Sequence, residues 1–155
     1  MKYLRKFNEG LTIDEVRELT YDIEDILIEV DDLNIKEDVD YDYEIKKISN
    51  GLTGKTNIFI IISKKNIALS SCRKFDGYNF FELSKIKPIF DRIVRIYIGE
   101  PFISVTYTSD SGQYQSIKGE YDKMLNKPQW VGGNIDTHYL IDGYEISNLK
   151  LILEV

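Results

Sequence analysis

Cysteine, histidine and tryptophan each occur once in this sequence of 155 residues, as Cys72, His138 and Trp130. One cysteine excludes an intramolecular disulfide and a zinc site built from paired thiols, and a chain without disulfides is typical of a reducing cytosol. The longest apolar run, 58–62, is far shorter than the roughly 20 residues of a transmembrane helix. Residues 1–10 lack the continuous apolar segment of a secretory signal. These absences predict a soluble protein of the cell interior.

Acidic residues are concentrated near the start of the chain, which has a net charge of -6. Residues 1–44 contain 15 acidic and 5 basic residues, a net charge of -10, whereas residues 45–155 contain 11 acidic and 15 basic residues, a net charge of +4. Such an acidic segment repels phosphate backbones, so nucleic-acid binding by the first part of the chain is disfavoured.

The pattern of apolar residues predicts an α+β fold. Thr12 and Glu15 form a capping-box pattern, and apolar residues then recur at three- and four-residue steps, which predicts a helix over 13–32. From Asp38 the period changes to two, with Tyr41 and Tyr43 on one face and the acids on the other, which is typical of a half-buried strand. The remaining patterns predict a strand at 57–63, a helix at 82–98, strands at 102–108 and 113–118, a short hairpin over 139–146 and a last strand at 149–155.

These elements, in the order α-β-β-α-β-β-β, predict two helices packed on a mainly antiparallel sheet in a single domain over 11–155. A possible short strand at 67–71 lies in a stretch without a clear period. Pro88 conflicts with the second helix unless it falls in the first turn, where a missing N–H costs little.

Several residues could carry chemistry, but none forms a specific motif. The stretch 51–56 resembles a phosphate-binding loop, yet it has two residues where that motif has four, so we interpret it as a hairpin turn. His138 beside Asp136 could act as a general base, and a structural role is the more common one for a lone histidine. Cys72 lies beside two basic residues without a second catalytic group.

Four carboxylates alternate along the first strand and define an alternative, enzymatic interpretation. Oxygen ligands of this kind suit calcium or magnesium, so a small metal-dependent hydrolase would use them, and the triplet 44–46 faintly resembles a nuclease pattern. A solvated strand face is the more common explanation for alternating acids. The candidate metal ligands are Asp38, Asp40, Asp42 and Glu44.

Met1-Lys2-Tyr3-Leu4-Arg5-Lys6-Phe7-Asn8-Glu9-Gly10 resembles the N-terminal tag of many small proteins of large tailed bacteriophages. In T-even-like phages this tag resembles the capsid-targeting peptide of internal proteins, which the prohead protease removes after a glutamate. The resemblance implies that residues 1–10 form a tag or arm and that Glu9 and Gly10 flank a processing junction, although Phe7 stands where the pattern prefers Leu or Ile. It also implies a location in the bacterial cytoplasm, the virion interior or both.

The preferred hypothesis is a non-enzymatic phage protein that needs no cofactor and acts through its acidic N-terminal part. If the acids of the first helix and first strand formed one continuous face, they would mimic nucleic-acid phosphates and occupy a basic site on a host or virion protein. Aromatic side chains often anchor interfaces, so tryptophan is a further candidate. The predicted partner-binding residues are Asp22, Asp25, Glu29, Asp32 and Trp130.

Overall fold

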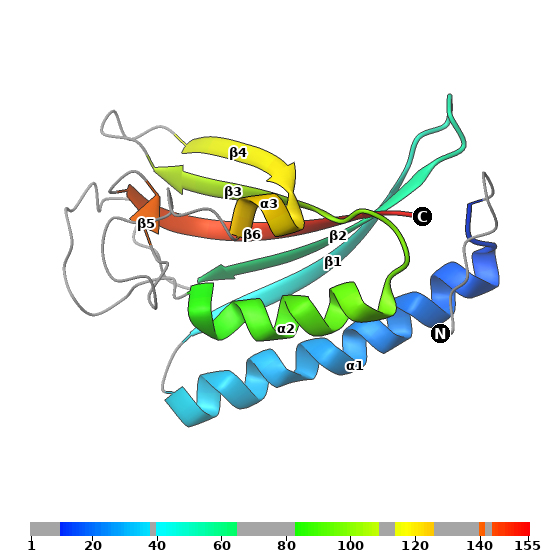
Figure 1. Ribbon diagram of the computed structural model, residues 1–155. Coiled ribbons are helices and arrows are strands. Elements are labelled where there is room, and N and C mark those ends of the chain that lie inside the picture. The colour runs from blue at the N-terminus through cyan, green and yellow to red at the C-terminus, as the bar shows by residue number, and fades with distance from the viewer. Residues whose placement is uncertain (1–9, 38–39, 65–82, 109–113, 126–139, 142–143) are drawn as a thin grey trace.

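The computed structural model describes residues 10–37, 40–64, 83–108, 114–125, 140–141 and 144–155. It confirms the predicted α+β class, with the helices on one face of an antiparallel sheet (Figure 1). The five main strands have the order β1-β2-β6-β3-β4, and the short strand β5 pairs with β6. The elements are α1 (Ile13–Glu37), β1 (Tyr41–Ser49), β2 (Thr56–Lys64), α2 (Leu83–Ile96), β3 (Phe102–Thr108), β4 (Tyr114–Glu120), α3 (Tyr121–Leu125), β5 (Leu140–Ile141) and β6 (Tyr144–Glu154).

Helix α1 begins with the predicted capping box and is longer than predicted. The backbone N–H of Thr12 donates to Oε2 of Glu15 at 2.7 Å, and the N–H of Glu15 donates to the Thr12 hydroxyl at 3.2 Å. The helix continues five residues past the predicted end at 32, and Asn34 in this last part contacts the start of β1. Its side-chain amide donates to the carbonyl of Tyr41 and accepts from the N–H of Tyr41, which joins the end of α1 to the start of β1.

Helix α2 corrects the expectation for Pro88. The helix begins at Leu83, so Pro88 is its sixth residue and lies beyond the first turn. The missing N–H leaves the carbonyl of Ser84 without its helical donor. Both residues are exposed, so water can reach that carbonyl.

Two further differences arise in the last third of the chain. Strand β4 continues past its predicted end at 118 to Glu120, and α3, for which no helix was predicted, follows directly. The hairpin of β5 and β6 is confirmed, but residues 144–154 form one strand where two were predicted. Thr106 pairs with Asn148 and Tyr107 with Ile146, so Ser147 is an extra residue in β6. This bulge shifts the side-chain alternation by one residue.

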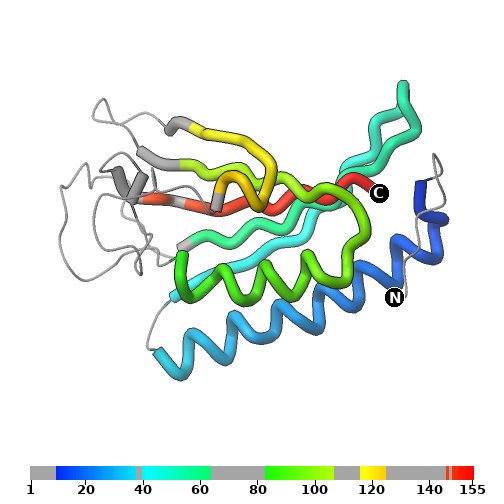
Figure 2. The backbone as a smooth tube through the Cα atoms, viewed as in Figure 1, coloured from blue at the N-terminus to red at the C-terminus, as the bar shows by residue number. Residues whose placement is uncertain are grey.

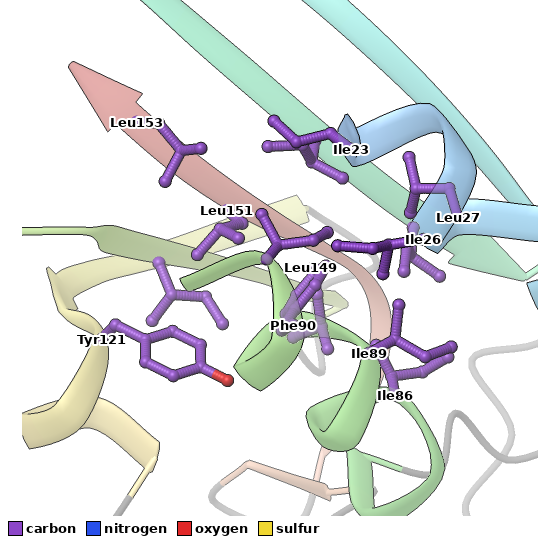
Figure 3. Close-up of a cluster of buried hydrophobic side chains, with 14 of the residues drawn as sticks. Ile23, Ile26, Leu27, Ile86, Ile89, Phe90, Tyr121, Leu149, Leu151 and Leu153 are labelled. Carbon is purple, nitrogen blue, oxygen red and sulfur yellow. The ribbon is translucent and has the colours of Figure 1, made fainter. Parts of the chain in front are cut away.

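The hydrophobic core lies between the sheet and the helices. Alternate residues of the central strands point to the helices, and each of these side chains is buried: Ile58, Ile60 and Ile62 from β2, Leu149, Leu151 and Leu153 from β6, and Ile103 and Val105 from β3. Figure 3 shows Ile23, Ile26 and Leu27 of α1 meeting Ile86, Ile89 and Phe90 of α2 over this layer. The packing of the core therefore determines which side of α1 is exposed to solvent.

Candidate surface on helix α1

Helix α1 runs beside α2 in the layer of helices that covers one face of the sheet (Figures 1 and 2). Its buried residues, Leu19, Thr20, Ile23, Ile26, Leu27 and Val30, point to α2 and the sheet. Side chains that are three, four or seven residues apart share one side of a helix, so the side opposite these residues faces solvent. We call this side the outward stripe; it consists of Asp14, Glu18, Tyr21, Asp25, Ile28, Asp32 and Ile35, all of them exposed.

Large apolar side chains interrupt the acids of the outward stripe at regular intervals. Tyr21 is 58% exposed, Ile28 is 53% exposed and Ile35 is 83% exposed. Single exposed apolar side chains are normal on a protein surface. Three at a constant spacing of seven residues lie in one row along the helix, and an apolar row rimmed by charge is typical of an interaction surface.

Some acids of α1 have partners within the fold and hold the helix in place. Glu29 forms an ion pair with Arg92 of α2. Glu37 forms a second ion pair with α2, in which its Oε2 lies 3.2 Å from Nζ of Lys85. On the other flank, Asp31 accepts a hydrogen bond from the Tyr43 hydroxyl of β1 at 3.2 Å. These contacts satisfy the carboxylates at the two flanks of α1.

The acids nearer the solvent have no such partners. Among the residues that the structure describes, no cation or side-chain donor contacts the carboxylates of Glu18, Glu24, Asp25 or Asp32. The pKa of Tyr43 is raised, first by burial, then by the charge of Asp31 and the hydrogen bond to it, and then by the charges of Asp42 and Glu24. The phenol stays neutral because an anion there would be repelled.

The predicted partner-binding residues fall into three groups. Asp25 and Asp32 lie on the outward stripe. Asp22 and Glu29, also seven residues apart, lie on the flank of α1 that faces α2, where Glu29 pairs with Arg92. Trp130 lies outside the described residues, as do Glu9, Asp38 and His138, whereas Gly10 is described and exposed.

The acids of β1 do not continue this surface. Tyr41 and Tyr43 point to the helices, as predicted, so Asp42 and Glu44 point to the opposite face of the sheet. Glu44 forms an ion pair with Lys46 at 3.3 Å. No group of three or more carboxylate, histidine or cysteine side chains in the described ranges is placed to hold a metal ion. Among the described residues, the acids of α1 and those of β1 therefore lie on different faces, so the condition that they form one continuous face is not met.

The outer face of the sheet is a second exposed region, but its apolar side chains are partly covered. Phe59, Ile152 and Phe102 lie in one row across β2, β6 and β3. The ammonium group of Lys150 lies 5.3 Å from the ring centre of Phe59, and that of Lys118 lies 5.5 Å from the ring centre of Phe102. Long lysine side chains can shield apolar surface in this way while they keep their charge in water. Within the described part of the chain, no cation lies over the ring of Tyr21 in this way.

The acids of α1 were predicted from the sequence, but the apolar row was not. Tyr21, Ile28 and Ile35 stand outside the apolar stripe that predicts the buried side of the helix, and no role was predicted for them. The structure shows that all three are exposed on one side of α1.

The fold and this surface define an α+β protein with two long helices on one face of an antiparallel sheet, the first of which exposes acidic and apolar side chains. Comparisons with protein-family models, curated proteins and solved structures give no match. No helix in the described ranges has the length and apolar character to cross a membrane.

Proposed function

We propose that this protein acts without catalysing a reaction, as a bacteriophage accessory or virion-packaged protein that binds a basic site on a host or virion protein. The binding surface is the outward stripe of α1. The observation that carries the proposal is the combination, on one helix side, of exposed apolar side chains with the carboxylates of Glu18, Asp25 and Asp32, which have no ionic partner among the described residues.

The charge of the stripe supports a basic protein as the partner. Exposed like charges on one surface attract an oppositely charged surface over about 10 Å at physiological salt, and they raise the rate of association. A nucleic acid would be repelled by the same charges. The apolar side chains would supply the short-range contacts, because charge alone contributes more to rate and specificity than to affinity.

The phage setting is supported by the resemblance of residues 1–10 to the N-terminal tags of small proteins of tailed phages. That segment lies almost wholly outside the described residues, so the surface on α1 and the origin of the chain are independent parts of the proposal.

Affinity capture from a bacterial lysate, at low and at high salt and with mass spectrometry of the retained proteins, tests the proposal. The test protein carries Asp25→Lys and Asp32→Lys. The matched control carries Glu100→Lys and Asp122→Lys, which change the net charge equally at exposed acids outside α1.

We expect the original protein and the control to retain the same basic protein at low salt and to release it at high salt, because salt screens charge pairs near the surface. The Asp25/Asp32 variant should not retain it. Equal retention by all three proteins would contradict the proposed surface.

A further inference from the structure

The seven-residue spacing of Tyr21, Ile28 and Ile35 bears on which kind of partner segment can bind α1. Seven residues of an α-helix correspond to almost two turns and about 10 Å of rise. The three side chains therefore form an apolar row, slightly slanted to the axis, along a helix of 25 residues, with exposed fractions of 58%, 53% and 83%. Two helices that pack side by side meet through two apolar positions in each seven-residue repeat, and this row supplies one of the two.

Carboxylates lie on both sides of the apolar row. Glu18, Asp25 and Asp32 follow one side, and Glu24 lies on the other, next to the flank where Asp31 accepts the hydrogen bond from Tyr43. In two-helix contacts, charged residues beside the apolar row determine which helix is accepted. The complementary helix would carry Lys or Arg at these positions.

The same charges argue against other occupants. A second copy that used its own outward stripe would bring acids against acids in either orientation, and like charges placed together cost free energy. Anionic lipid surfaces and nucleic acids would be repelled for the same reason.

We propose, as an extension of the proposed function and resting on it, that the outward stripe of α1 docks an amphipathic α-helix of a basic partner protein. That helix carries apolar residues at seven-residue intervals on one side and is flanked by lysine or arginine. The contact is a helix-on-helix seam in which Tyr21, Ile28 and Ile35 are the apolar anchors and the acids set the choice of partner.

Two synthetic peptides of three heptads test this proposal. The first has leucine at the repeating apolar positions and lysine at the flanking positions; the second has the same composition in a scrambled order that destroys the repeat. Binding of each fluorescently labelled peptide is measured by anisotropy, and helix formation on binding is followed by circular dichroism.

Two variants distinguish the contribution of the apolar row to peptide binding from that of the carboxylates. The first carries Ile28→Ser and Ile35→Ser, and the second carries Asp25→Lys and Asp32→Lys. All four positions are exposed, so we expect thermal unfolding of both variants to match that of the original protein, and the melting curve checks this.

We expect the periodic peptide to bind the original protein and gain helix content, and the scrambled peptide to bind more weakly. The serine variant should lose about tenfold or more in affinity for the periodic peptide, as is found when apolar anchors of an interface are removed. Equal binding of both peptides, with no effect of the serine changes but a loss on charge reversal, would overturn the helix seam and leave the acidic surface standing. Absence of binding by either peptide would overturn both.

Discussion

The hydroxyl of Tyr121 donates a hydrogen bond to Oδ1 of Asp91 at 2.7 Å and so joins α3 to α2. Oδ2 of the same carboxylate accepts a hydrogen bond from the ammonium group of Lys87, also at 2.7 Å. Tyr121 is only 3% exposed, and its ring lies beside the core in Figure 3. Burial raises the pKa of this phenol, and the hydrogen bond to Asp91 and the charge of Asp91 raise it further.

This raised pKa predicts a loss of stability at alkaline pH. An unfolded tyrosine ionises near pH 10, whereas folded Tyr121 stays neutral there. The contribution of Tyr121 is therefore complete below about pH 10 and declines as the pH rises above that value, because the unfolded state gains an ionised form.

Replacement of Tyr121 by phenylalanine keeps the aromatic ring and removes the hydroxyl group that donates to Asp91. At pH 7 we expect a loss of about 1.5–3 kcal/mol in the free energy of unfolding, typical of a hydrogen bond to a charged acceptor. Above about pH 10 the stability of the variant should fall less steeply than that of the original protein. Urea denaturation of both proteins at several pH values measures this, and parallel pH profiles would contradict the account.

Two adjacent residues of α1 should differ sharply in their contribution to stability. Leu27 is fully buried, whereas Ile28 is 53% exposed on the outward stripe. Leu27→Ala should cost about 2–5 kcal/mol because it leaves a cavity in the core. Ile28→Ala should change stability by no more than about 0.5 kcal/mol. Chemical denaturation of the two variants checks the pair; a large loss for Ile28→Ala would show that this side chain packs within the fold.

Gly99 should not tolerate a side chain. A Cβ at this position would lie 2.6 Å from Cζ of Tyr97, and the backbone φ of 156° is rare for residues with a side chain. Tyr97 cannot easily give way, since it is 6% exposed and its hydroxyl donates to the carbonyl of Glu154 at 2.7 Å. Gly99→Ala should therefore cost about 1–3 kcal/mol.

Gly51 provides the matched control for this change. No atom lies within 4 Å of a Cβ placed there, so Gly51→Ala should leave the melting temperature almost unchanged. Equal melting temperatures for the Gly99 and Gly51 variants would show that the close contact with Tyr97 does not constrain the loop before β3.

Much of this fold was predictable because its elements have strong local signals. The capping box of Thr12 and Glu15 and the alternation of Tyr41 and Tyr43 were interpreted correctly from the sequence. Thr12 and Glu15 are three residues apart and contact each other directly. Tyr41 and Tyr43 are two residues apart and lie on the same face of β1.

The misread elements depend on distant contacts. The extra residue Ser147 shifts the alternation between Ile146 and Leu149, so one strand has the pattern of two. Helix α3 has five residues, too few for a periodic pattern, and is held by Tyr121 against Asp91 of α2. The candidate surface also depends on distant contacts. Its acids are evident in the composition, but the exposure of the apolar row follows from the packing of α1.

Hydrogen–deuterium exchange of the protein, free and bound to the captured partner, tests the central claim most directly, because it reports which backbone segments the partner protects. We expect added protection over residues 14–36 of α1 and unchanged exchange in β3, β4 and β6. Protection centred on those strands, with α1 unchanged, would place the partner on the outer face of the sheet and contradict the account.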